Sequence, residues 1–213
     1  GDQEGEVISK KEAVFNEAQL KETLQKFIGD ITQIPPMYSA LKFEGRPLYE
    51  YARQGIEIER KSRQITIYDI GLMEFQGSVM TIEVSCSKGT YIRTLAEDIG
   101  HALGCGAHLK GLERTQTGNF QLTEALTIEA LEAMDSISRE KVLLPIDALL
   151  EGLPSIELTS AETELIKKGQ SIDFISKNEE ELRLYSVSGQ FVGVGQPDLQ
   201  VRLFPKRLIA YIL

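Results

Sequence analysis

The chain has 213 residues and a net charge of −9, and 42% of its residues are apolar, which allows one or two domains with a buried core. It contains no apolar run near the roughly 20 residues that cross a membrane, and no signal segment at its start. Two cysteines are too few for a disulfide framework and two histidines are too few for a histidine-rich metal site, so we expect a cytoplasmic protein without a metal.

The acidic residues are concentrated in one segment. Residues 119–185 carry fourteen acidic and six basic side chains, whereas residues 35–63 carry four acidic and six basic ones. Residues 86–118 and 186–213 are also mildly basic. A polyanion could contact the basic segments and avoid the acidic one, but excesses of one or two charges are also ordinary variation along a chain.

Residues 16–28 are predicted to form an amphipathic helix. Asn16 and Gln19 have the spacing of a capping box, which satisfies free N–H groups at a helix start. Gly29 follows as the stop, since glycine readily adopts the backbone conformation that ends a helix.

Segment 33–55 combines helix-breaking prolines with aromatic and basic side chains. Pro35 and Pro36 forbid a helix there, and Pro47 can be the first residue of a short helix that ends near Gly55. The aromatic and basic residues are Tyr38, Lys42, Phe43, Arg46, Tyr49, Tyr51 and Arg53. Such a mobile element suits stacking on bases and contact with phosphates; alternatively, its tyrosines simply pack back on the core.

Residues 64–75 and 79–86 alternate in polarity and predict a β-hairpin around residues 76–78. After a turn at 87–89, Thr90 is a good N-cap for a helix over 91–103. Lys88 and Arg93 then lie at a helix N-terminus, where cations oppose the dipole, which suggests that an anion binds nearby. Alternatively, Arg93 pairs with Glu97 one turn later, and Lys88 is an ordinary turn lysine.

Residues 104–109 form a glycine-bracketed connection into a predicted strand over 108–116. His108 in this connection is either a functional base or ligand, or a structural histidine that satisfies a loop hydrogen bond. Antiparallel hairpins with a helix after the strands favour an α+β fold.

The C-terminal part is predicted to be a small β-rich module. One or two short acidic helices are expected over 127–151, with a domain boundary near 152–155. Thr159 and Glu162 form a second capping box, and Gly169 ends that helix. Strands are expected near 182–187, 190–195, 199–203 and 207–212.

Four strings of residues, in this order and spacing, resemble the bacterial TruB family, the tRNA pseudouridine synthases that modify the T-loop uridine at tRNA position fifty-five. The strings are QIPPMYSALK at 33–42, LYEYAR at 48–53, SKGTYIRTL at 87–95 and GCGAHL at 104–109. The resemblance covers essentially the whole chain. It implies a pseudouridine synthase fold of class α+β, with a mixed, largely antiparallel sheet and flanking helices, over 1–152, with an RNA-binding insert near 33–60. It also implies a PUA-like RNA-binding domain over 153–213.

The resemblance further implies the activity. These enzymes isomerise uridine to pseudouridine without a metal, nucleotide or redox cofactor, so we expect no cofactor. The expected partner is the T-arm of tRNA, and the chain is expected to be a monomer. The target base leaves the loop stack, because its glycosidic bond and C5 edge are otherwise out of reach. An aspartate then attacks the nucleoside, at sugar C1′ or base C6, and the base is detached, turned and rejoined through C5.

The family's functional residues carry over to several positions of this sequence. Arg93 matches the arginine that holds the catalytic carboxylate, a task that suits a bidentate guanidinium. Tyr91 matches the tyrosine that lines the uridine pocket, and Leu112 matches the apolar residue that packs on the flipped base. The candidate RNA contacts are Tyr38, Lys42, Arg46, Arg53 and Lys88.

The resemblance leaves the nucleophile unassigned. In the family it lies in an upstream Gly-x-Leu-Asp-Pro-type loop, and no aspartate of this chain, Asp2 included, has that context. We expect that the N-terminal part with the nucleophile is absent and that these residues alone are inactive. The alternatives are a non-catalytic module that binds structured RNA and, from the charge of 119–185, an acidic protein-interaction domain.

Overall fold

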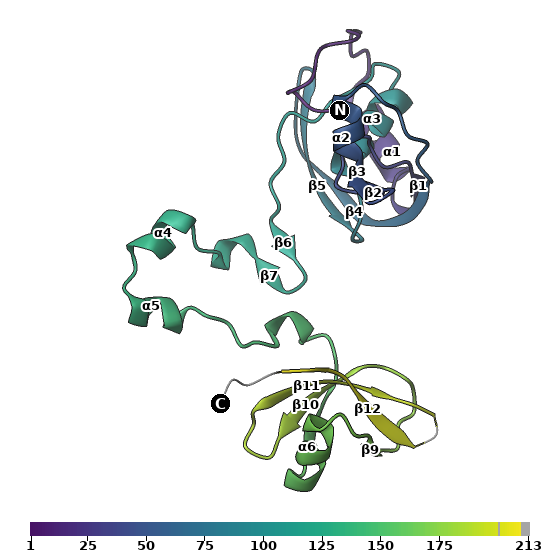
Figure 1. Cartoon of the computed structure of the whole chain (residues 1–213). Coiled ribbons are helices and arrows are strands. Elements are labelled where there is room, and N and C mark those ends of the chain that lie inside the picture. The colour runs from purple at the N-terminus through teal and green to yellow at the C-terminus, as the bar shows by residue number, and fades with distance from the viewer. Residues whose placement is uncertain (200, 210–213) are drawn as a thin grey trace. The chain divides into compact units, whose positions relative to one another are not determined.

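A computed structural model describes residues 1–199 and 201–209, and the chain divides into two compact units, 1–113 and 114–213 (Figure 1). The boundary predicted near 152 falls inside the second unit, so the division into 1–152 and 153–213 stays a prediction. Within the described residues, no helix has the length and apolar character needed to cross a membrane.

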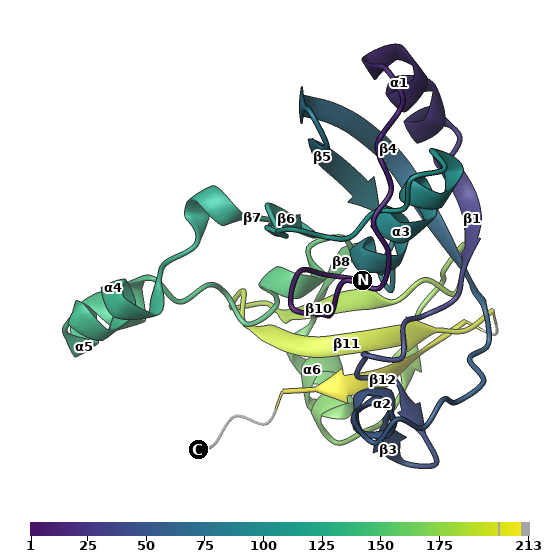
Figure 2. The ribbon, with the colours of Figure 1, turned by 90° about the horizontal axis from the view of Figure 1, so that it is seen from above.

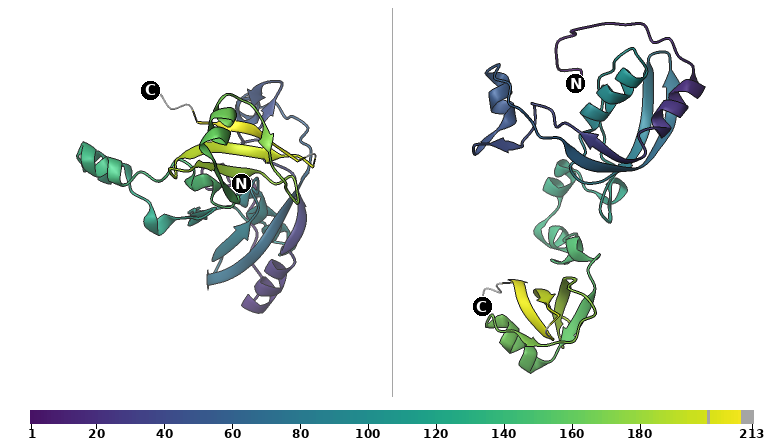
Figure 3. Two further views of the ribbon diagram at one scale, coloured as in Figure 1. Left: turned by 90° about the horizontal axis from the view of Figure 1, so that it is seen from below. Right: turned by 90° about the vertical axis from the view of Figure 1, so that its right-hand side faces the viewer.

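The first unit is an antiparallel sheet with helices on one face. Its elements are α1 (Glu17–Gln25), β1 (Gly29–Gln33), β2 (Lys42–Phe43), β3 (Arg46–Pro47), α2 (Leu48–Arg53), β4 (Arg63–Gln76), β5 (Val79–Cys86) and α3 (Ile92–Ala102). Strands β1, β4 and β5 pair in that order, with Ile67 of β4 opposite Gly29 on one side and Cys86 on the other. Helices α1 and α3 lie against the same face (Figure 3, right), where apolar residues of α1, β4 and α3 form the core. The fully enclosed members are Leu20, Leu24, Ile65, Ile67, Ile70, Leu95 and Ile99.

Several predicted elements of this unit are confirmed. The capping box of α1 is formed, with Asn16 and Gln19 exchanging side chain–backbone hydrogen bonds of 2.9 Å. The helix ends at Gln25, three residues before the predicted end. The hairpin of β4 and β5 turns at Gly77, whose φ is +58°.

Two details at the start and end of α3 differ from prediction. The N-cap is Tyr91 rather than Thr90, because the Thr90 hydroxyl donates back to the carbonyl of Ser87 at 2.9 Å and closes the turn instead. The strand predicted over 108–116 does not form. Leu109 forms only an isolated parallel bridge with Asp2, and Gln116 at the far end of the range begins the two-residue strand β6, which pairs with residues 120–121.

Helix α2 also begins one residue later than predicted, because Pro47 is its N-cap and not its first residue. The strand β1 and the small hairpin of β2 and β3 were not predicted. The hairpin turns at Glu44 and Gly45, which both have positive φ, of 49° and 81°.

The second unit begins with short elements and ends in a five-stranded sheet. The elements are β6 (Gln116–Thr117), β7 (Phe120–Gln121), the 3-10 turn η1 (Leu122–Glu124), α4 (Ile128–Ala133), α5 (Ser136–Lys141), η2 (Ala148–Leu150), β8 (Ser155–Leu158), α6 (Ser160–Lys167), β9 (Ile172–Asp173), β10 (Leu182–Ser186), β11 (Phe191–Pro197) and β12 (Arg202–Leu208). The sheet order is β8-β10-β11-β12-β9, with β8 parallel to β10 and the other pairs antiparallel. Strands β10, β11 and β12 lie side by side (Figure 2), and Ile166 of α6 packs into the core against them.

The predictions for this unit are confirmed in part. Two short helices, α4 and α5, and the capping box of Thr159 and Glu162 are present, but only α4 is acidic, since α5 carries Arg139 and Lys141 against one glutamate. One strand, β12, replaces the two predicted over 199–203 and 207–212; residues 200 and 210–212 of these ranges lie outside the described residues. Strands β8 and β9 were not predicted, since with four and two residues they are too short for a reliable periodic pattern.

Candidate active site

The turn between β5 and α3 is closed by its own side chains. Ser87 continues the ladder, because its N–H donates to the Thr66 carbonyl at 2.8 Å and its hydroxyl accepts from the Thr66 N–H at 2.9 Å. Gly89 has a φ of +87°, in the left-handed region that glycine adopts without steric cost. These contacts fix the point at which the chain leaves the sheet and enters α3.

Tyr91 stands at the start of α3, and its backbone is held from β1. The side-chain amide of Gln33 accepts from the Tyr91 N–H at 2.8 Å and donates to the Tyr91 carbonyl at 3.1 Å. Arg63, the first residue of β4, places its guanidinium carbon 6.0 Å from the centre of the Tyr91 ring. The tyrosine predicted to line the pocket therefore has a cation beside its ring, at the outer limit of a cation–π contact.

Arg93 joins the first turn of α3 to two distant segments. Its Nη1 lies 3.0 Å from Oδ2 of Asp2, and its Nη2 donates to the backbone carbonyl of Tyr38 at 2.6 Å. Glu97 lies instead 3.3 Å from the amino group of Gly1. Arg93 thus pairs with a carboxylate from outside its helix rather than with Glu97, the alternative that the spacing left open.

Asp2 is the site residue that sequence reasoning missed. Its bridge to Leu109 is accompanied by backbone hydrogen bonds of 2.8 and 3.1 Å, which hold residues 1–3 beside the loop that follows α3. This places the carboxylate of Asp2 against Arg93, with side chains that are 32% and 30% exposed. No local motif marks Asp2, because its position depends on a bridge between segments far apart in the sequence.

Close packing at Gly100 brings the loop after α3 back onto the helix. The N–H of Gly106 donates to the Gly100 carbonyl at 2.9 Å. A Cβ at position 100 would lie 2.2 Å from the backbone nitrogen of Ala107, closer than any real contact, so a side chain there would push the loop away. The GCGAHL string therefore has a structural role, since it leads the chain from α3 to the bridge with Asp2.

The insert between β1 and β4 stacks its own cations on tyrosines. Tyr51 is buried, donates to the Phe43 carbonyl at 3.2 Å, and has the guanidinium of Arg46 4.8 Å from its ring centre. Arg53 lies 5.2 Å from the ring centre of Tyr49. Tyr51 therefore packs back on the protein, as one of the two alternatives expected, and contact of this segment with RNA stays a prediction.

The other candidate residues are exposed. Lys42 lies on the small hairpin and Lys88 in the turn before α3, both facing solvent, and the Tyr38 side chain is 55% exposed. Leu112 is 63% exposed in the segment before β6. The described contacts join Tyr38 to Arg93, but they do not join Lys88 or Leu112 to it.

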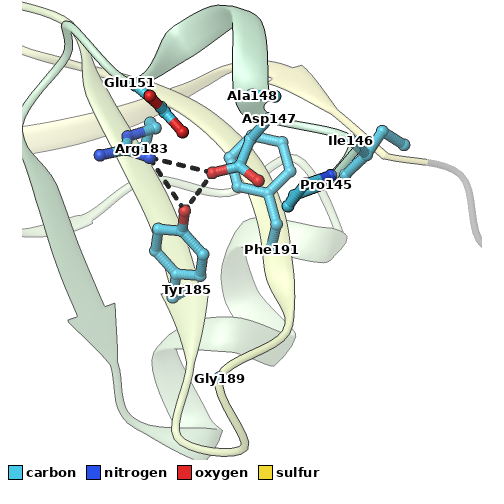
Figure 4. Close-up of a pocket in the computed structure, with 9 residues that line it drawn as sticks. All are labelled: Pro145, Ile146, Asp147, Ala148, Glu151, Arg183, Tyr185, Gly189 and Phe191. Atoms are coloured by element: carbon cyan, nitrogen blue, oxygen red, sulfur yellow. Dashed lines mark hydrogen bonds and ion pairs between the residues drawn. The ribbon is translucent and has the colours of Figure 1, made fainter. Parts of the chain in front are cut away.

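A cavity of about 460 Å³ lies in the second unit, and none of the predicted site residues lines it (Figure 4). In it, Arg183 Nη1 lies 3.1 Å from a carboxylate oxygen of Asp147, and the Tyr185 hydroxyl donates to the same oxygen. The tyrosine hydrogen bond, followed by the Arg183 contact, holds the pKa of Asp147 below its ordinary 3.8, and the carboxylate raises the pKa of Tyr185 above 10.0. These polar groups satisfy one another, which makes the network a structural one.

Within the described ranges, no three His, Cys, Asp or Glu side chains gather in a way that could hold a metal ion. The first turn of α3 carries the guanidinium of Arg93 with the carboxylate of Asp2, and the N-cap residue Tyr91, two positions earlier, has the guanidinium of Arg63 near its ring. Such a set can hold a second carboxylate and stack on a base, because a guanidinium has more N–H donors than Arg93 uses in its two contacts.

Three family models match the chain. Residues 1–92 match the N-terminal domain of the TruB family pseudouridylate synthases, and residues 93–151 match the C-terminal domain of tRNA pseudouridylate synthase B. Residues 154–209 match the C-terminal part of the TruB pseudouridine synthases II. The chain belongs to the TruB family of pseudouridylate synthases.

Curated relatives carry the name tRNA pseudouridine synthase B. The protein of Dechloromonas aromatica is 47% identical over 98% of this chain and 70% of its own length, and that of Chromobacterium violaceum is 48% identical over 99% and 70%. Identity of this degree over nearly the whole chain extends the family assignment to all the elements described above.

Solved structures show the same fold. The structure titled as a Cbf5-Nop10-Gar1 complex matches with a TM-score of 0.70 and 22% identity over 91% of this chain. An H/ACA RNP bound to a substrate RNA containing 2′-deoxyuridine matches with a TM-score of 0.69 and 19% identity over 92%. The chain spans 62% of each of those chains. The mixed α+β fold with antiparallel sheets is thus similar to the fold in these two structures.

Proposed function

We propose that these residues belong to a tRNA pseudouridine synthase whose target is the T-loop uridine at tRNA position fifty-five. The observation that carries the proposal is the contact between Arg93 and Asp2 beside Tyr91, in a chain of the TruB family. The relatives named for tRNA support the substrate class, and the SKGTYIRTL string supports the target uridine.

The reaction is an isomerisation in which the bond between N1 and C1′ breaks and a bond between C5 and C1′ forms. C5 loses its proton and N1 gains one, so the composition of the RNA does not change. Arg93 holds a reacting carboxylate ionised and oriented, because a guanidinium binds both oxygens of a carboxylate in one plane. Tyr91 offers its ring to the flipped base, and base–aromatic stacking compensates for part of the stacking lost from the loop.

We also propose that the nucleophilic aspartate is not one of the aspartates of these 213 residues. The Gly-x-Leu-Asp-Pro-type loop that carries it in the family does not occur in this sequence. Asp2, the carboxylate that meets Arg93, is held by its own bridge to Leu109, which suits a residue that fixes the guanidinium. On this proposal the 213 residues alone bind tRNA without isomerising it.

The remaining assignments follow the same resemblance. The insert near 33–60 contacts the T-arm through Tyr38, Lys42, Arg46 and Arg53. Lys88 is a further RNA contact, and Leu112 packs on the flipped base. Residues 153–213 form a PUA-like RNA-binding domain that follows the catalytic domain of 1–152. The protein is a cytoplasmic monomer that needs no cofactor. Light scattering tests whether it is a monomer, and activity in the presence of a chelator tests whether it works without a metal.

Tritium release tests the proposed activity. Isomerisation replaces the C5–H bond, so tRNA transcribed with 5-tritiated uridine loses label only at the modified site. We expect the full-length gene product to release label from a tRNA transcript, and not from one in which the T-loop uridine is replaced by cytidine. RNA binding without release by the full-length product would favour a non-catalytic RNA-binding module instead. Failure to bind tRNA at low salt would favour a protein-interaction domain.

A further inference from the structure

Gln33 makes an unusual contact for a buried polar residue. It is the last residue of β1, its exposed fraction is 1%, and its amide forms two hydrogen bonds with the backbone of Tyr91, 58 positions later in the chain. One bond satisfies the Tyr91 N–H and the other its carbonyl, so the side chain takes the place of a neighbouring strand. Both polar ends of the amide are therefore satisfied inside the protein.

These two bonds act at the residue from which α3 starts. The Tyr91 carbonyl also accepts the helical hydrogen bond from the Leu95 N–H at 3.0 Å, and no side chain caps the helix. Rotation of the Tyr91 backbone would break both bonds to Gln33 and leave buried polar groups unsatisfied. The direction of the Tyr91 ring and the position of Arg93, two residues further on, therefore depend on this amide.

The neighbours of Gln33 hold the same segment in place. Arg63 is its register partner on β4 and lies beside the Tyr91 ring. Downstream, Arg60 donates to the Pro35 carbonyl at 3.3 Å, and Arg93 donates to that of Tyr38. Segment 33–38 is thus tied to the start of α3 at both of its ends, by Gln33 and by Arg93.

We propose that Gln33 is a positioning residue of the uridine site, which acts through Tyr91 and Arg93 and does not touch the RNA. This inference rests on the proposed function and assigns a role to the glutamine of the QIPP string. A residue needed only for the core would be served better by an apolar side chain, because an amide must be matched at both ends once it is buried.

Gln33→Met tests this role, because methionine has nearly the same shape and cannot form either bond. Gln64→Met is the matched control: Gln64 lies next to Arg63 on β4, is exposed, and gives up only its bond to Thr32. Single-turnover isomerisation and the Kd for tRNA are measured on the full-length gene product. We expect Gln33→Met to lower the rate about tenfold or more while Kd stays within about twofold, and Gln64→Met to change neither.

A second readout separates positioning from general damage. In protein labelled with fluorotyrosine, the ¹⁹F resonance of Tyr91, assigned by Tyr91→Phe, should shift or broaden in Gln33→Met while that of Tyr185 stays unchanged. If Gln33→Met does not fold, Gln33→Leu takes its place, since leucine is also neutral and apolar and forms neither hydrogen bond. A folded variant with the wild-type rate, or an equal loss of rate and affinity, overturns the proposal. An inactive wild-type protein would instead overturn the proposed function.

Discussion

Asp2 and Arg93 lie 91 positions apart in the sequence, and their side chains meet at 3.0 Å beside the first turn of α3. The pair forms because residues 1–3 bridge to Leu109. Leu109 lies close to α3 because the loop after the helix folds back onto it. The guanidinium that is unfavourable at a helix N-terminus thereby has an acidic partner from outside its helix.

Asp2→Asn should slow isomerisation without abolishing it. The amide oxygen still accepts from Arg93, but the charge that strengthens the hydrogen bond is lost, which corresponds to a rate lower by about 10- to 100-fold. Unfolding free energy should change by less than about 1 kcal/mol, because the pair is one-third exposed. Single-turnover assays and urea unfolding measure the two effects. Complete loss of turnover would indicate that Asp2 is itself the nucleophile.

Lys42→Glu should weaken tRNA binding in a salt-dependent way. Lys42 is exposed on the hairpin of the insert, where a phosphate contact would release a counterion. We expect the slope of log Kd against log salt concentration to fall by about one. The control is Lys141→Glu, which makes the same change of charge in the acidic segment. An identical slope for wild type and Lys42→Glu would count against residues 35–55 as an RNA-binding element.

Gly100→Ala should destabilise the first unit by about 1–3 kcal/mol, because the added methyl group meets the backbone of Ala107 and must displace the loop. Gly71→Ala is the control, since a Cβ there has nothing within 4 Å. Urea unfolding followed by circular dichroism measures the difference. Equal stability of the two variants would show that α3 and the loop are not in close contact.

Tyr185→Phe should reduce stability within a defined pH window. The hydrogen bond from Tyr185 holds the pKa of Asp147 below its ordinary 3.8 in the folded state. The stabilisation from this bond to the ionised carboxylate is therefore present above about pH 4 and is lost as pH falls through the folded pKa. The hydrogen bond to Asp147 raises the pKa of Tyr185 above 10.0. The stabilisation from the protonated Tyr185 hydroxyl is therefore present below about pH 10 and is lost as pH rises through the folded pKa. The deficit, about 1 kcal/mol, should therefore appear between these limits and shrink on the acid side. Thermal unfolding of both proteins across pH measures the loss of stability, with Tyr68→Phe at an exposed tyrosine as the control. A loss of stability that did not change with pH would contradict the prediction.

The sequence predicted those parts of the fold that local signals specify. The capping boxes of α1 and α6, the β4–β5 hairpin and the position of Arg93 in the first turn all follow from short patterns. Features that depend on distant pairing were missed. The strand β1 needs β4 beside it, β8 needs β10, and Asp2 becomes a partner of Arg93 only through its bridge to Leu109.

Turnover and tRNA affinity of Arg93→Lys in the full-length gene product test the central claim most directly. Arg139→Lys on α5, in the acidic segment, is the control. Lysine keeps the charge and loses the bidentate geometry, so a misplaced carboxylate should lower the single-turnover rate about a hundredfold or more. The account predicts that Kd for tRNA stays near the wild-type value. An unchanged rate, or an affinity lost in the same proportion as the rate, would contradict the role of Arg93 in orienting the reacting carboxylate.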